Sequence, residues 1–180
     1  TALGFRSLTY NITGYSNTAI GLESLFENTT GYDNTSTGIQ SLFKNTTGYR
    51  NTADGAAALY SNTTGFHNTV MGYSVLASNT TGSYNVALGY EAGALNVSCS
   101  NNVFIGHQAG YNETGSNKLY ISNSETVNLI TGDFSTGYLS LGRTGLANGG
   151  IGIYGDLGAQ FMDDDASHYV AFVAPASVSS

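Results

Sequence analysis

The chain has 180 residues with a formal net charge of −7, and only 9% of its residues are charged. So acidic a composition without a basic cluster makes nucleic acid an unexpected partner, and the 41% apolar fraction argues against disorder. The apolar runs are too short to cross a bilayer, so we expect no membrane insertion, and the single cysteine, Cys99, excludes an internal disulfide.

A repeat of 17 residues runs without insertion through almost two thirds of the chain. Asparagines recur at this spacing, and a glycine follows each of them by four residues. The asparagines are Asn17, Asn34, Asn51, Asn68, Asn85 and Asn102, and the glycines are Gly21, Gly38, Gly55, Gly72, Gly89 and Gly106. Positions within the repeat are numbered from this asparagine, so that Asn17 is position 1. Such periodicity is typical of a stack of like units, and it favours a structural or display role over an enzyme.

The first full unit predicts two short strands, at Thr18–Ile20 and Leu22–Phe26, because its glycines and threonines disfavour a helix. Gly21 fits a corner between them, where a missing side chain permits a positive φ. The Asn-Thr-Thr-Gly sequence at 28–31 predicts a turn. Each unit is then one coil of an all-β parallel solenoid, a β-roll repeat domain that we place at residues 1–115.

Three columns of the stack carry expectations about the core. Position 9 predicts an internal leucine ladder, and position 3 is small in most coils, with Phe104 as the exception. Position 4 is mostly apolar but contains Asp54. We expect Asp54 either to break the core as a polar residue, which we favour, or to form a cation site with its symmetry mates around a threefold axis.

Coils this thin bury few apolar side chains each, so a single chain needs another surface, and copies of itself provide the simplest one. We therefore expect a homo-oligomer.

The 17-residue period fades after Gly106, and residues 116–180 form a predicted β-rich connector or stalk. Short alternating stretches predict strands there, which we expect to interweave between chains. The stretches are Lys118–Ser122, Tyr138–Leu141, Gly152–Tyr154 and His168–Val173.

The sequences NTAIG, NVALG and NVFIG, with the NTTG turns, resemble the head repeats of trimeric autotransporter adhesins, whose coils are usually shorter. The segments GYNETGSNKLYISNS and LITGDFSTGYLSLG are similar to those that follow such rolls in bacteriophage tail fibres. The final DDDASHYVAFVAPASVSS resembles the connector before a chaperone domain of tail fibres. The resemblance implies a left-handed β-roll, a homotrimer, and an extracellular location on a virion tail fibre or a bacterial surface, between which the sequence does not decide.

No catalytic, metal-binding or cofactor-binding pattern is present: the three histidines are scattered, and no nucleophile elbow or phosphate loop occurs. We expect no enzyme and no cofactor. The aromatic column at position 16 is a candidate site for stacking on sugar rings, although a stabilising ladder or a trimer seam is the favoured interpretation. Its members are Tyr15, Tyr32, Tyr49 and Phe66.

Eight asparagines lie in Asn-X-Ser/Thr sequences, which would accept glycans only in a eukaryotic secretory pathway. They are Asn11, Asn28, Asn34, Asn45, Asn62, Asn79, Asn96 and Asn112.

These observations favour a structural or adhesive segment of an extracellular homotrimeric fibre that binds, or helps to bind, a cell-surface receptor such as a glycan. An ice-binding solenoid is the alternative, because threonines form a regular double column beside the turn. Its members are Thr29, Thr46, Thr63 and Thr80 at position 13, and Thr13, Thr30, Thr47, Thr64 and Thr81 at position 14.

Overall fold

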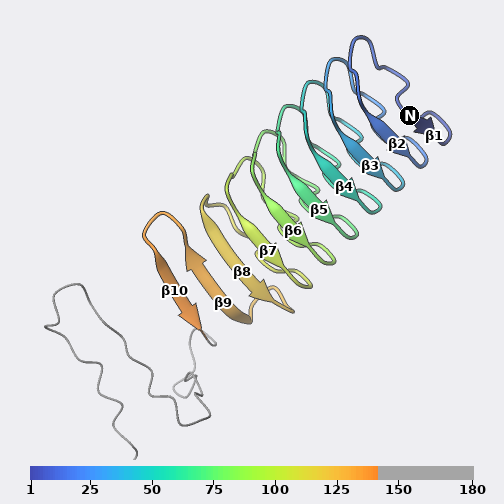
Figure 1. Ribbon diagram of the computed structural model, residues 1–180. Coiled ribbons are helices and arrows are strands. Elements are labelled where there is room, and N and C mark those ends of the chain that lie inside the picture. Colours follow the sequence, from blue (N-terminus) through green and yellow to red (C-terminus); the bar gives the residue numbers. More distant parts are fainter. Residues whose placement is uncertain (142–180) are drawn as a thin grey trace, which may run out of the picture. The chain divides into compact units, whose positions relative to one another are not determined.

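The computed structural model describes residues 1–141, and every regular element in this range is a β-strand (Figure 1). The strands are β1 (Ala2–Leu3), β2 (Thr18–Ile20), β3 (Thr35–Thr37), β4 (Thr52–Asp54), β5 (Thr69–Met71), β6 (Val86–Leu88), β7 (Val103–Ile105), β8 (Lys118–Ser122), β9 (Asn128–Asp133) and β10 (Tyr138–Leu141). The strands predicted at Gly152–Tyr154 and His168–Val173 lie outside the described residues.

The strands form one sheet in which they follow each other in chain order, as Figure 1 shows. Strands β1 to β8 are parallel, and each residue pairs with the one 17 positions later, as Thr18 does with Thr35. The last step is one residue shorter, since Val103 pairs with Leu119. This register confirms a β-solenoid with one coil per repeat.

The second strand predicted in each coil is wrong. The segment Leu22–Phe26 forms consecutive turns, because Glu23 and Leu25 adopt left-handed backbone conformations with φ of 55° and 51°. The segment is still bonded from coil to coil, since the Leu25 N–H donates to the Ser41 carbonyl at 3.0 Å. The repeated left-handed residues keep it from extending, so each coil has one three-residue strand.

The corner predicted at position 5 is confirmed. Gly55 has φ of 136°, and a Cβ placed on it would lie 2.6 Å from the carbonyl carbon of Gly72 in the next coil. Both the backbone conformation and the contact with the next coil therefore require glycine here.

The interior contains the predicted leucine ladder, and Leu25, Leu42, Leu59 and Leu76 are fully buried. The ladder ends where the larger Phe104 enters the core at position 3. Gly93 and Gly110 occupy the ladder position on either side of its ring, and a Cβ on them would lie 2.6 and 2.5 Å from ring atoms. The large residue at position 3 and the glycines at position 9 thus compensate each other in volume.

Two buried asparagine columns join the coils through their side chains. At position 1, Asn34 Nδ2 donates to Asn17 Oδ1 at 3.1 Å and to the Gly48 carbonyl at 2.9 Å. At position 12, Asn45 Nδ2 donates to Asn28 Oδ1 at 2.8 Å. The same bonds recur in successive coils, so the asparagines form two amide ladders along the stack.

The parallel stack continues through β8, and antiparallel pairing starts with β9. Tyr120 of β8 pairs with Thr131 of β9, and Thr131 pairs with Ser140 of β10. The strands predicted at Lys118–Ser122 and Tyr138–Leu141 are present with those bounds, whereas β9 was not predicted. Strands β8, β9 and β10 pair with one another within one chain.

Candidate functional site

The aromatic column at position 16 is a continuous stack. The ring centroids of Tyr15, Tyr32, Tyr49 and Phe66 follow each other at 5.0, 4.8 and 4.8 Å, with interplanar angles of 9° or less. Each ring face inside the column is therefore covered by the next ring, and only the edges of Tyr32 and Tyr49 reach solvent. Since a sugar stacks on ring faces, the geometry fits the stabilising ladder better than a row of sugar subsites.

Serines replace the aromatic residues at position 16 in the following coils. Ser83 Oγ accepts the Phe66 N–H at 3.1 Å, and Ser100 Oγ accepts the Ser83 N–H at 3.0 Å. The aromatic contact moves one residue along the chain, where His67 and Tyr84 stack at 5.2 Å. Position 16 thus changes from ring stacking to backbone hydrogen bonding while the coil keeps its shape.

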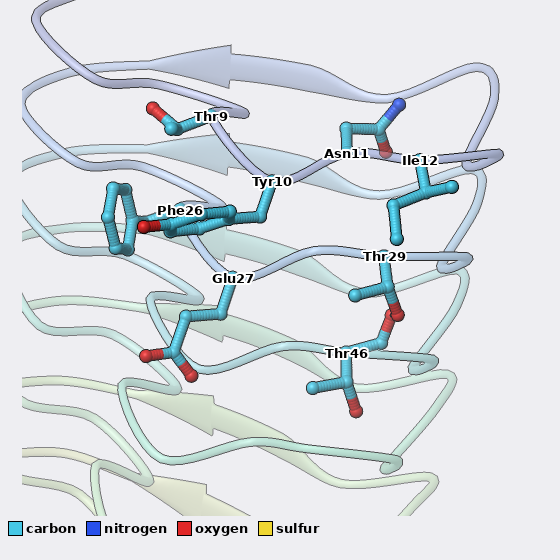
Figure 2. Close-up of a pocket in the computed structure, with 8 residues that line it drawn as sticks. All are labelled: Thr9, Tyr10, Asn11, Ile12, Phe26, Glu27, Thr29 and Thr46. Atoms are coloured by element: carbon cyan, nitrogen blue, oxygen red, sulfur yellow. The ribbon is translucent and has the colours of Figure 1, made fainter.

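A hollow of about 720 Å³ lies on the surface of the first coils (Figure 2). Tyr10, Phe26 and Glu27 line one side of it, and Ile12 and Thr29 line the other. Tyr10 packs edge-on against Phe26 with the ring centroids 4.8 Å apart. The exposed Tyr10 ring together with a carboxylate and hydroxyls is a chemistry that recognises polyols such as sugars. The repeat does not predict this hollow, because Tyr10 and Ile12 occur in one coil only.

The side chains at positions 2, 4 and 6 point away from the interior and form what we call the outward face. Position 4 was expected to face the core or a threefold axis, and the structure excludes the core of the single chain. Ile20, Met71 and Leu88 are 38%, 53% and 45% exposed, and Asp54 is exposed between them. The favoured prediction of a polar break in the core at Asp54 is therefore wrong: in a three-residue strand the middle residue points inward, and Asp54 is the third residue of β4.

The outward face is unusually apolar for a surface. Its position 4 carries Leu3, Ile20, Thr37, Asp54, Met71, Leu88 and Ile105, and its position 6 carries Phe5, Leu22, Ile39, Ala56, Tyr73, Tyr90 and His107. Tyr73, Tyr90 and His107 stack in succession at 5.4 and 5.3 Å. Apolar area in one strip is typical of an interaction surface.

Six of the eight asparagines in glycosylation sequences are buried in the ladders. They are Asn28, Asn34, Asn45, Asn62, Asn79 and Asn96, each 1% exposed or less. Asn112 is exposed and Asn11 partly exposed. A glycan needs a free amide nitrogen, so the folded coils leave Asn11 and Asn112 as the accessible acceptors.

The double threonine column divides into two kinds of side chain. The position-13 hydroxyls donate along the stack, as Thr29 Oγ1 does to the Thr46 carbonyl at 2.9 Å. The position-14 side chains, such as Thr30 and Thr47, are exposed. Only half of the column is thus free to bind anything outside the chain.

Ionisable side chains gather where the parallel stack ends. Tyr120 donates to Glu113 at 2.5 Å, and burial together with this bond raises the pKa of Tyr120 to about 12. Lys118 Nζ lies 2.5 Å from Asp133 Oδ2, and this bond, with further bonds from Ser135, holds the pKa of Asp133 well below its ordinary range. These carboxylates are engaged in structural contacts, and residues 1–141 bring no three His, Cys, Asp or Glu side chains together to hold a metal ion.

The chain matches no protein-family model, no curated protein and no solved structure. Residues 1–141 contain no helix with the length and apolar character that crossing a bilayer requires.

Proposed function

We propose that this chain is a structural and adhesive segment of an extracellular homotrimeric fibre, on a virion tail or a bacterial surface, with a left-handed coil. The observation that carries the proposal is the uninterrupted stack, in which each coil offers the next coil the same donors, acceptors and apolar side chains. Such a stack extends in one direction and makes a spacer that separates a binding tip from the body to which it is anchored.

The side-chain ladders support a spacer that resists changes of solvent. Parallel strands lie about 4.8 Å apart, so β1 to β8 extend over roughly 34 Å. The contacts along this length are amide pairs, leucines and stacked rings, which salt does not screen. The proposal includes no catalytic role.

The hollow in Figure 2 supports a contribution to receptor binding, with a cell-surface glycan as the ligand class. Tyr10, Ile12 and Glu27 lie at positions that carry other residues in the following coils. Phe26, in contrast, begins an aromatic stack that continues through Phe43 and Tyr60. A surface that differs from the repeat is where specificity for a receptor would lie.

An ice-binding solenoid is the second candidate, and one observation favours it. The strands β2 to β5 place Thr18, Thr35, Thr52 and Thr69 in register on the outward face of a parallel sheet. This candidate requires a free outward face, whereas a homotrimer held through that face would cover it.

The test is the mass and the activity of the purified chain at micromolar concentration. Size-exclusion chromatography with light scattering should give three times the 18.7 kDa mass of one chain, with no thermal hysteresis in the same sample. A stable monomer would contradict the fibre proposal, and a monomer with thermal hysteresis would support the ice-binding candidate instead.

A further inference from the structure

The outward face has one charged side chain among its strand positions, and it lies at the centre. Asp54 on β4 pairs in register with Thr37 on β3 and with Met71 on β5, so neither neighbouring strand brings a titratable group to it. His107 and the amino group of Thr1, in the same columns, each lie three coils away, about 14 Å at the spacing of parallel strands. Apolar side chains dominate the coils on both sides of Asp54.

The face is large enough to be covered by another copy of this chain. Seven strands about 4.8 Å apart, each presenting about 13 Å of its length, give an area of about 440 Å². Three such faces buried around one axis remove roughly 1,300 Å² from water, which exceeds the ~1,000 Å² that a specific interface needs. The face continues into an apolar hollow of about 540 Å³ lined by Ile105, Ile121 and Leu129, which adds to this area.

The repeat favours a second copy as the occupant. Another copy presents the same apolar columns at the same spacing, so apolar side chains meet along the whole length of the face, and it brings the same single acid to the same height. Position 4 is the middle of the three outward positions, so parallel copies around a threefold axis bring this column closest to the axis.

This inference rests on the proposed homotrimer. We propose that three copies bury their outward faces against one another with the position-4 column beside the threefold axis, so that three Asp54 carboxylates meet inside an apolar interface and make the trimer stronger at acidic pH. The interface assigns a role to the one charged residue of the position-4 column.

The sign follows from proton binding. Three carboxylates at one height in an apolar interface disfavour each other's charged form, so the trimer binds more protons than three separate chains do. Association is then strongest at acidic pH, and it weakens as the pH rises through the range in which the assembled carboxylates ionise. A rise of one pKa unit changes the association constant about tenfold for each carboxylate.

The experiment compares the full chain with Asp54→Asn by sedimentation equilibrium at pH 4.5 and pH 7.5. The association constant of the unaltered trimer should rise at least about tenfold at pH 4.5, and Asp54→Asn should remove most of this difference by strengthening the trimer at pH 7.5. Asp33→Asn is the matched control, because Asp33 is an exposed acid that pairs with Arg50 at 3.5 Å and lies outside the three columns.

A second pair of variants tests the face itself. Met71→Lys should give monomers with an unchanged circular dichroism spectrum, since Met71 is 53% exposed in the single chain. Ile12→Lys, at a residue that is 75% exposed elsewhere, should leave the trimer intact.

The outcomes separate the interface from the fibre proposal. A monomer at both pH values would contradict both proposals. A trimer that Met71→Lys does not dissociate would overturn this interface alone. Equal pH dependence in Asp54→Asn and in the unaltered chain would overturn the role of Asp54.

Discussion

The coil stack and the strands that end it satisfy their polar groups in different ways. Between β1 and β7 neutral amide bonds recur in successive coils, as those of Asn34 and Asn51 do, and the two ion pairs there involve exposed arginines. Around β8 to β10 the polar contacts do not repeat, and one of them is the ion pair of Lys118 and Asp133. The difference teaches that a repeated coil can satisfy its polar groups with the same hydrogen bond each time, whereas at the irregular end each polar group needs a partner of its own.

The two regions should therefore respond differently to the same kind of change. A substitution of a buried, uncharged residue inside the stack disturbs the coil before it and the coil after it, so its effect on stability is large and independent of pH. A change at the end of the stack affects one pair, so its effect is local and follows the ionisation of that pair.

The largest expected effect is that of Gly55→Val. The corner combines φ of 136° with a Cβ position 2.6 Å from the Gly72 carbonyl carbon, so strain and overlap together should lower the free energy of unfolding by at least about 3 kcal/mol. Gly137→Val is the control in the end region, because Gly137 has φ of 72° but nothing within 4 Å of its Cβ position. Its cost should be about 1–2 kcal/mol. Urea unfolding measures both, and equal values would show that the contact between coils does not matter.

A smaller effect is expected for Asn51→Ala, in the middle of the position-1 ladder. Asn51 Oδ1 accepts the Asn68 N–H at 3.0 Å, and its Nδ2 donates to the Gly65 carbonyl at 2.9 Å. Removing these two bonds leaves the buried Asn68 N–H without a partner, whereas the Gly65 carbonyl keeps its bond from Asn62, so the substitution should cost about 1–3 kcal/mol. Asn112→Ala, at an exposed asparagine bonded to Glu125, should cost less than about 1 kcal/mol. Thermal unfolding that shifts equally in both variants would remove the distinction between the two regions.

The smallest effect is the acid response of β9 and β10. The bond from Lys118 lowers the pKa of Asp133, so this carboxylate stabilises the hairpin above its unfolded pKa of about 4, and the contribution is lost as the pH falls below that value. Amide exchange, corrected for its intrinsic rate, should show faster opening at Tyr138 and Leu139 at pH 2.5 than at pH 5. In the Asp133→Asn variant, β10 should open as fast at pH 5 as it does at pH 2.5. Acid-induced opening of equal size in β4 and β5 would contradict the local origin of the effect.

The sequence predicts those parts of the fold that depend on repetition. The period set the register, and Gly21, the Asn28 turn and the Leu25 ladder followed from residue types that recur at one position. The strand predicted at Leu22–Phe26 failed because nothing in a leucine or a glutamate indicates that it will adopt a positive φ.

Whether a side chain points into the coil or away from it is harder to predict. Three-residue strands leave little alternation to read, and apolar residues occur on both faces, so Asp54 was placed in the core although it is exposed. The hollow does not follow from the repeat because Tyr10 and Ile12 occur in one coil only, although Phe26 belongs to a periodic aromatic column with Phe43 and Tyr60. Strand β9 is not predicted because its sequence, NLITGD, contains a glycine.

The identity of donors and acceptors from coil to coil also means that the length of this protein can change in fixed steps. Removing or duplicating 17 consecutive residues between Asn17 and Phe66 joins two coils that were already compatible, and it moves whatever lies beyond by about 4.8 Å. Unequal recombination between repeated gene segments would produce such changes and would keep the pairing register between the coils. Reach is therefore a property that this chain can adjust through copy number alone, with no substitution needed.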